Sequence, residues 1–226
     1  MNSRQQVLLL VGSPGGAKST SESLGAYLLA QLPAKGFATE KVYIYPSVNS
    51  KKGRAALLAE ADRADLVILV FPLYVDSLPA PVTRTLELIH DHRRQSSQVK
   101  ATRFMAMTNC GFPEAHQCQT ALSICRLFAR QAGFEWAGGL ALGGGGAIGG
   151  KPLEKAGYMA KSVRKALELV GAALAEGQPV PQAAVDLMAK PLMPTWLYLF
   201  SANLGWHLQA RKNKVRKQLR ARPFQS

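Results

Sequence analysis

The sequence predicts an α/β fold in which a five-stranded parallel sheet lies between two layers of helices, with a helical extension at the C-terminus. Apolar runs of strand length alternate five times with segments of helical periodicity. The third run, residues 66–71, is apolar on both faces, as expected for a strand covered by helices on both sides. The chain has 226 residues, 47% of them hydrophobic, which is enough for one sizeable core.

The elements are expected in strict alternation along the chain. Strands are expected at residues 6–12, 39–45, 66–71, 103–108 and 134–142. Helices, marked by apolar residues that recur every three or four positions, are expected at residues 21–32, 53–61, 81–92, 115–132 and 153–175. Right-handed crossovers leave few topologies for such a sheet, and ligands in these folds bind beyond the carboxyl ends of the strands.

The loop after the first strand is the most informative stretch of the chain. Residues 12–21 read Gly-Ser-Pro-Gly-Gly-Ala-Lys-Ser-Thr-Ser and lie between a strand and a helix. Backbone N–H groups in such a loop, together with the positive end of the helix dipole, form a site for an anion. Hydroxyl groups near this loop are supplied by Ser13, Ser19, Thr20, Ser21 and Ser23. Their density favours a single terminal phosphate held without a metal ion.

Two other interpretations of this loop remain open. The pattern partly matches the nucleotide-binding P-loop G-x-x-x-x-G-K-[ST] through Gly12, Lys18 and Ser19. However, Ala17 occupies the position of the second glycine, and the third strand runs into Pro72 rather than into an acidic residue that could bind magnesium. Alternatively, the hydroxyl groups only cap the helix and hold no ligand, since Ser and Thr favour helix N-termini.

Three further loops follow the third, fourth and fifth strands and would meet at the same edge of the sheet. Residues 72–81 form a proline-rich loop with one aromatic side chain, Tyr74, which could flank a planar ring. Residues 108–114 contain Gly111, which permits a close approach of the backbone to a ligand. Residues 143–152 are rich in glycine and could form a lid or a bed for a second ligand.

Taken together, the segments GSPGGAKSTSESL, VFPLYVDSLPAPV and TNCGFPE resemble those of NAD(P)H-dependent FMN reductases and related flavodoxin-like oxidoreductases. The resemblance covers about residues 6–175. It implies a flavodoxin-like fold that binds FMN, with NAD(P)H as co-substrate. It also implies a small-molecule electron acceptor, such as a quinone or a flavin, and a homodimer.

The resemblance further implies which residues contact the cofactor. The phosphate would be held in the first loop by Ser13, Ser19, Thr20 and Ser21. The isoalloxazine ring would lie between two sets of residues, Pro72, Leu73, Tyr74 and Val75 on one side and Asn109, Cys110, Gly111 and Phe112 on the other. Many relatives carry an arginine where this chain has Gly15. Either Lys18 supplies the missing positive charge, or the phosphate rests on backbone amides alone.

The implied reaction needs no catalytic side chain, because in flavin enzymes the cofactor carries the chemistry while the protein binds and orients it. Hydride would pass from NAD(P)H to flavin N5, and electrons would then leave to the acceptor. Loop amides would stabilise negative charge near N1 and O2. The histidines are expected to be surface or helix residues, namely His90, His92, His116 and His207. The main alternative is a non-enzymatic electron carrier of the flavodoxin type, although such carriers tend to be smaller and acidic.

The cysteine spacing and the distribution of charge indicate which metals and partners the chain is expected to bind. Cys110, Cys118 and Cys125 lack C-x-x-C spacing, which argues against an iron–sulfur cluster, a zinc site or a disulfide framework, so no metal is expected. No secretory signal or 18-residue apolar span is recognisable, so a cytoplasmic location is expected. The net charge of +14 is uneven, because eight basic residues and no acidic one follow Asp186. The charge therefore characterises the C-terminal segment, and no nucleic-acid partner is expected.

The expected domains are an FMN-binding domain over residues 1–178 and an extension over residues 179–226. In the extension, residues 194–222 combine helical spacing with aromatic side chains and then become strongly basic. The spacing is carried by Trp196, Leu199, Phe200, Asn203 and Trp206. Such a segment could lie on an anionic surface as an interfacial helix. It could also pack its aromatic side chains on the domain or on a dimer mate, which the flanking prolines favour.

Overall fold

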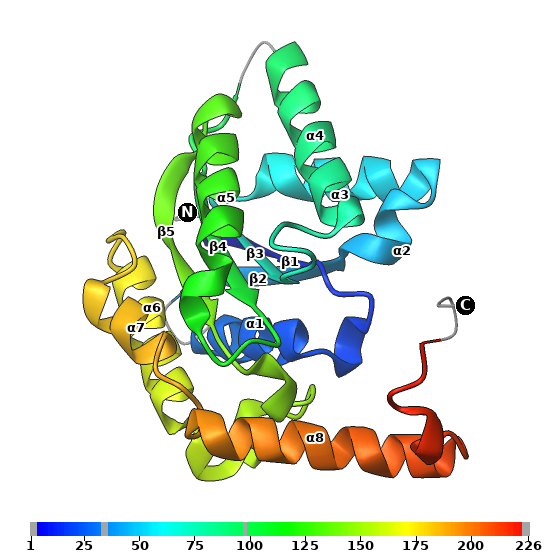
Figure 1. Cartoon of the computed structure of the whole chain (residues 1–226). Coiled ribbons are helices and arrows are strands. Elements are labelled where there is room, and N and C mark those ends of the chain that lie inside the picture. Colours follow the sequence, from blue (N-terminus) through cyan, green and yellow to red (C-terminus); the bar gives the residue numbers. More distant parts are fainter. Residues whose placement is uncertain (1–3, 33–35, 97–98, 223–226) are drawn as a thin grey trace. The chain divides into compact units, whose positions relative to one another are not determined.

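The computed structural model describes residues 4–32, 36–96 and 99–222 and confirms the flavodoxin-like fold (Figure 1). The sheet has five parallel strands in the order β2-β1-β3-β4-β5. They are β1 (Gln6–Val11), β2 (Ala38–Tyr43), β3 (Leu66–Pro72), β4 (Arg103–Asn109) and β5 (Glu135–Leu142). The winding of this order reverses between β1 and β3, which is where ligands bind in doubly wound sheets.

Helices cover both faces of the sheet. One face carries α1 (Thr20–Gln31), α6 (Lys161–Ala175) and α7 (Gln182–Met188). The other carries α2 (Ile44–Val48), α3 (Lys51–Arg63), α4 (Ala80–Gln95) and α5 (Gln119–Gln131). Successive side chains of β1 point to opposite faces of the sheet. Val7, Leu9 and Val11 pack in the hydrophobic core under α1 and α6, whereas Leu8 and Leu10 pack in the core on the other face.

Two expected helices are interrupted by 3₁₀ turns. The segment expected as one helix over residues 115–132 begins with η3 (Ala115–Cys118) and continues as α5. The segment over residues 153–175 contains η5 (Leu153–Lys155), η6 (Gly157–Ala160) and then α6. The second interruption follows from Gly157, whose φ of +67° lies outside the helical region. The short helices α2 and α7 were not expected, because so few residues show no clear periodicity.

The chain forms two compact units, divided between Leu192 and Met193. The first unit includes α7, whose Ala184 and Met188 are buried in its core. The division into an FMN-binding domain over residues 1–178 and an extension over residues 179–226 stays a prediction.

The second unit contains α8 (Thr195–Lys212) and η7 (Arg216–Gln218). Helix α8 contains the predicted helical spacing of Trp196 to Trp206 and stops at Lys212, and Lys214 adopts a left-handed φ of 60°. Within the described ranges, no helix has both the length and the apolar character needed to cross a membrane.

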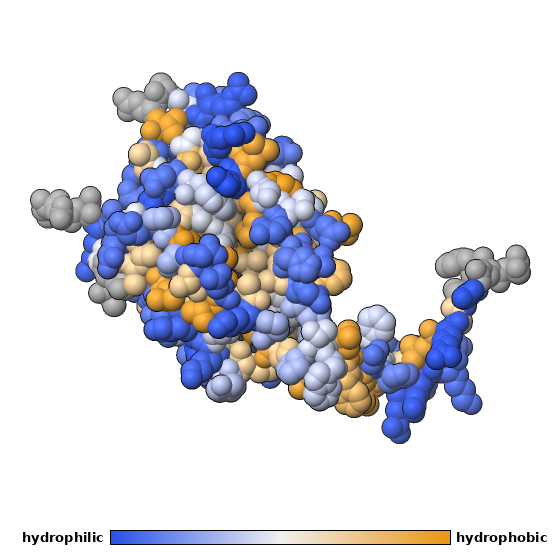
Figure 2. All heavy atoms as spheres, turned by 60° about the vertical axis from the view of Figure 1, so that its left-hand side comes forward, coloured by the Kyte–Doolittle hydropathy of each residue, from blue (hydrophilic) through white to orange (hydrophobic). Residues whose placement is uncertain are grey.

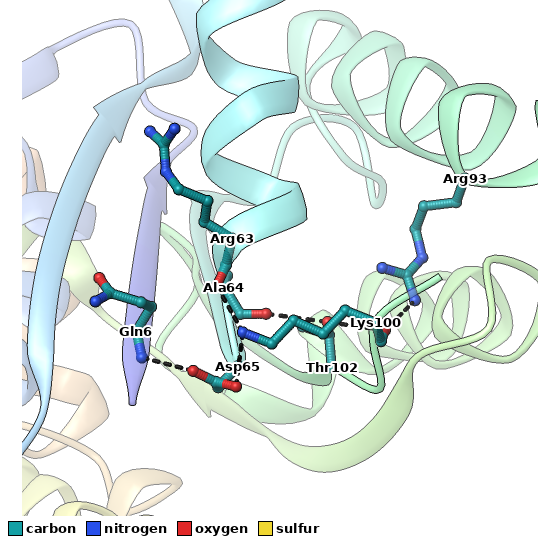
Figure 3. A network of polar contacts seen from close by, with 7 residues as sticks. All are labelled: Gln6, Arg63, Ala64, Asp65, Arg93, Lys100 and Thr102. Carbon is teal, nitrogen blue, oxygen red and sulfur yellow. Dashed lines mark hydrogen bonds and ion pairs between the residues drawn. The ribbon is translucent and has the colours of Figure 1, made fainter. Parts of the chain in front are cut away.

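A polar network at the amino ends of the strands ties β1, β3 and β4 together (Figure 3). The backbone N–H of Gln6 donates to Asp65 Oδ2 at 2.7 Å, and Lys100 Nζ lies 2.8 Å from Asp65 Oδ1. Thr102 Oγ1 donates to the carbonyl of Ala64 at 3.0 Å. Burial tends to raise the pKa of Asp65, but the bonds from Lys100 and Gln6 outweigh it and hold this pKa below its ordinary value.

Arg93 of α4 completes this network from a buried position. Its Nε donates to the carbonyl of Ala132 at 2.7 Å, and its Nη2 donates to the carbonyls of Gly133 and Lys100 at 3.1 and 3.2 Å. The guanidinium carbon also lies 3.9 Å from the centroid of the Phe134 ring. One side chain therefore fixes the end of α5 and the chain that leads into β4.

We expect Arg93→Met to lower the free energy of unfolding by about 3 kcal/mol, because three carbonyl oxygens lose a charged donor. The neighbouring exposed Arg94 supplies the control, since Arg94→Met should change stability by less than about 0.5 kcal/mol. Urea denaturation measures both. Equal stability of the two variants would contradict the role assigned to Arg93.

Candidate functional site

The loop between β1 and α1 is built as the N-terminus of a helix that is open to an anion. Ser19 is the N-cap, and its Oγ accepts a hydrogen bond from the N–H of Glu22 at 3.1 Å and donates to the carbonyl of Gly16 at 2.7 Å. The N–H groups of Thr20 and Ser21 stand in the first turn, where a helix offers no internal acceptor. The helix dipole adds positive potential at the same point.

The other hydroxyl groups of this loop bind protein atoms. Thr20 Oγ1 donates to the carbonyl of Gly145 at 2.8 Å, and Ser21 Oγ accepts from Asn109 Nδ2 at 2.9 Å. Ser13 Oγ accepts a hydrogen bond from the backbone N–H of Gly15 at 3.3 Å. Ser21 is 1% exposed, so its side chain joins α1 to β4. Direct contact of these hydroxyl groups with a phosphate stays a prediction, as does that of the exposed Lys18.

The loops after β1 and β3 leave the sheet side by side. Gly12 N donates to the carbonyl of Val70 at 2.7 Å. A β-carbon at Gly12 would lie 2.5 Å from Val82 Cγ2, so this position has no room for a side chain. Neighbouring strands are about 4.8 Å apart, and the two loops therefore flank the point where the winding reverses.

The loop after β3 contains a tight turn in an unfavourable backbone conformation. Tyr74 N donates to the carbonyl of Ser77, and Ser77 N donates to the carbonyl of Tyr74, both at 3.0 Å. The two residues between them, Val75 and Asp76, have left-handed φ values of 49° and 56°. This conformation is costly for a β-branched valine, and such strain occurs at ligand-binding sites. The turn leaves Val75 98% and Tyr74 46% exposed.

The loop after β4 divides its predicted site residues into two groups. Asn109 and Cys110 are buried, whereas Gly111 and Phe112 are exposed, Phe112 by 51%. Asn109 Nδ2 donates to the carbonyl of Phe71 at 3.2 Å as well as to Ser21. Phe112 can therefore contact a ligand through its side chain, while Asn109 and Cys110 hold the loop in place. Pro72 and Leu73, at the start of the loop after β3, are half-buried.

The buried thiols differ in acidity. A hydrogen bond from Cys118 lowers the pKa of Cys110 to about 7 against the opposing effect of burial, and hydrogen bonds from the backbone at Phe112 and Gly144 add to the lowering. The same thiol pair, together with burial, raises the pKa of Cys118. Burial raises the pKa of Cys125 to about 12. Of the three described cysteines, Cys110 is therefore the most easily deprotonated.

The glycine-rich loop after β5 is packed against two of the other loops. Gly145 N donates to the carbonyl of Cys110 at 2.9 Å. A β-carbon at Gly145 would lie 2.9 Å from Asn109 Oδ1, and one at Gly150 would lie 2.1 Å from the carbonyl oxygen of Lys18. These contacts favour a bed beneath a ligand over a mobile lid.

Tyr45, which no sequence motif singled out, follows β2 as the second residue of α2. Burial raises the pKa of Tyr45, and the nearby Tyr74 raises it further. The end of β2 therefore reaches the loop after β3. The sequence predicts Tyr45 at the end of the second strand, over residues 39–45, whereas β2 ends at Tyr43.

The four histidines lie in helices or 3₁₀ turns, His90 and His92 in α4. His92 Nε2 lies 2.7 Å from Asp62 Oδ2, and His90 Nδ1 lies 3.1 Å from Asp91 Oδ1. His116 belongs to η3, and His207 belongs to α8.

Gly150→Ala tests the packing of the glycine-rich loop. We expect it to lower the free energy of unfolding by about 2 kcal/mol more than Gly149→Ala, because only residue 150 would press a β-carbon onto Lys18. Both positions have left-handed φ values, +71° and +59°, so the backbone cost is matched. Urea denaturation compares the two. Equal losses would show that the two loops separate at no cost.

No family model matches this chain, and no curated protein matches it. Solved structures do resemble it. A flavone reductase is 10% identical with a TM-score of 0.59, over 83% of this chain and 66% of its own. An NAD(P)H:quinone oxidoreductase from Methanothermobacter marburgensis is 16% identical with a TM-score of 0.54, over 74% of this chain and 96% of its own.

An FMN-dependent NADH-azoreductase from Bacillus anthracis, solved in complex with FMN, is 12% identical with a TM-score of 0.51. The alignment spans 76% of this chain and 99% of the azoreductase. At these identities the comparisons establish the fold. These three neighbours are named as oxidoreductases, which is the class of protein that the three loop segments resemble.

Proposed function

We propose that this chain is an FMN-dependent oxidoreductase that takes hydride from NAD(P)H and passes electrons to a small acceptor such as a quinone or a flavin. One observation carries the proposal. At the winding reversal, a hydroxyl-rich helix N-terminus adjoins loops that expose the apolar side chains of Tyr74, Val75 and Phe112. A ligand with a terminal phosphate and a large planar ring matches both parts of this edge.

The donor groups of the first loop fit a phosphate monoester. Open N–H groups at Thr20 and Ser21, the hydroxyl of Ser19 and the ammonium of Lys18 are all donors, and residues 12–21 contain no carboxylate. The Ser19 hydroxyl would exchange the carbonyl of Gly16 for a phosphate oxygen. The cap bond that it accepts from Glu22 would persist, so α1 would stay ordered on binding.

The loops after β3 and β4 fit the ring. When bound, FMN would supply the chemistry of hydride acceptance and electron delivery. Tyr74 and Phe112 would cover ring surface and exclude water from it. Backbone N–H groups of these loops would stabilise negative charge at the ring edge, because fixed dipoles need no reorganisation during the reaction.

The proposal extends to a homodimer and to a cytoplasmic location. Val75 is 98% exposed on a strained turn, and a second copy that covered this turn would close the ring side of the site. A cytoplasmic location agrees with NAD(P)H as co-substrate. The names of the solved neighbours support the general class, and either nicotinamide cofactor remains compatible with it.

Ser19→Ala tests the phosphate site. Loss of one hydrogen bond to a charged group should weaken FMN binding by about 1.5–3 kcal/mol, or roughly 10- to 150-fold, in a fluorescence titration. Ser50→Ala is the matched control, because Ser50 caps α3 through the N–H of Gly53 just as Ser19 caps α1. If both variants bind FMN like the original chain, the phosphate site has been assigned wrongly.

Tyr74→Ala tests the ring site and the reductase activity together. We expect slower bleaching of the flavin band after NADPH is mixed with the FMN-loaded protein without oxygen, because the ring loses a covering side chain. Tyr158→Ala, which removes an 85% exposed tyrosine from η6, should leave the rate unchanged. FMN binding without any bleaching by NADH or NADPH would identify an electron carrier instead.

A further inference from the structure

Helix α8 is apolar around most of its circumference. Residues 196–200 read Trp-Leu-Tyr-Leu-Phe, and successive helical residues advance by about 100°, so this run covers every side of the helix. No Asp, Glu, Lys or Arg lies in residues 191–210. A helical turn that is apolar all round requires apolar surroundings.

The second unit does not bury these side chains by itself. Trp196 and Trp206 are each 70% exposed, and Phe200 and Leu208 are 63% and 58% exposed. Only Ala210 is buried among the described residues of α8. The space-filling view shows hydrophobic surface on this unit that gives way to hydrophilic surface toward the C-terminal end (Figure 2).

Charge changes sharply along this unit. Seven of the 28 Lys and Arg residues of the chain lie in residues 211–222, and no acidic residue follows Asp186. The rest of the chain keeps 21 basic residues against all 14 acidic ones, so it is also net positive. The apolar part of α8 is thus joined directly to a dense cationic segment.

We propose that residues 195–222, here called the C-terminal anchor, bind the surface of a lipid bilayer that contains anionic phospholipids. Trp, Tyr and Phe side chains favour the boundary between headgroups and acyl chains, and Lys and Arg pair with anionic headgroups. Helix α8 is about 27 Å long, at 1.5 Å per residue, yet lacks the apolar character of a spanning helix. The anchor therefore rests at the surface, and this association is independent of flavin chemistry.

The charge of the anchor favours a bilayer over a second copy of the chain as the partner that covers α8. The homodimer proposed above involves the turn at Val75 and not the anchor. At the anchor, seven cations would meet a second copy that is itself net positive, whereas an anionic bilayer would attract them. Lipid at the bilayer surface can cover the exposed apolar side chains of Trp196, Phe200 and Leu208.

The test measures binding of the full-length protein to vesicles by co-sedimentation. Mixed phosphatidylcholine and phosphatidylglycerol vesicles are compared with pure phosphatidylcholine vesicles at low and high salt. Each cation near an anionic surface contributes about fivefold, so removal of three should weaken binding about 100-fold. The anchor variant carries Arg211→Gln, Lys212→Gln and Lys214→Gln. The charge-matched control removes three exposed cations from the first unit through Lys51→Gln, Lys52→Gln and Arg130→Gln.

A second variant, Trp196→Ser with Trp206→Ser, tests the apolar contribution. The proposal expects binding to mixed vesicles that weakens with salt, falls in both anchor variants and is kept by the control. Equal weakening in the anchor and control charge variants would overturn it, since binding would then follow net charge alone. Absence of vesicle binding would also overturn it. A tryptophan variant that changes the oligomeric mass and retains vesicle binding would assign α8 to a second copy instead.

Discussion

The buried side-chain amide of Asn109 is the interaction on which the candidate site depends. Its Nδ2 donates to Ser21 of α1 and to the carbonyl of Phe71 in β3, and its Oδ1 leaves no room for a β-carbon at Gly145. One residue at the end of β4 thus joins a helix, a neighbouring strand and the loop after β5. Because a buried amide must keep its hydrogen bonds, these pieces hold a common arrangement.

The fold could be predicted because its signals are local and repeated. The β-branched run in β3 and the spacing of Leu24, Leu28 and Leu32 correctly indicated a buried strand and a helix face, and all three leucines are at most 1% exposed. Helix ends were harder to predict. The left-handed residues Gly157 and Lys214 break segments that remain periodic in sequence, since periodicity reports a buried face and not the backbone angle of one residue.

The candidate site was predictable at the level of loops but not of contacts. Glycine and hydroxyl content singled out the loop between β1 and α1 as the candidate phosphate site, because those residue types are needed wherever a backbone approaches an anion. Nothing in the sequence indicated that Ser21 would be bound to Asn109 or that Val75 would adopt a left-handed conformation. Such contacts join residues far apart in the chain, and the strain in the turn after β3 is maintained by its surroundings.

The close packing of Gly145 and Gly150 limits how the loops of this site can change during evolution. The loop after β5 touches the loops after β1 and β4 through positions that admit no side chain. The sequences of the three loops therefore cannot change independently of one another. A chimaera that received only a foreign loop after β5 would lose its fit to Lys18 and Asn109. Recombination among proteins of this fold should therefore succeed when these loops are exchanged as one block, and new ligand preferences should arise at Val75, whose side chain is almost fully exposed.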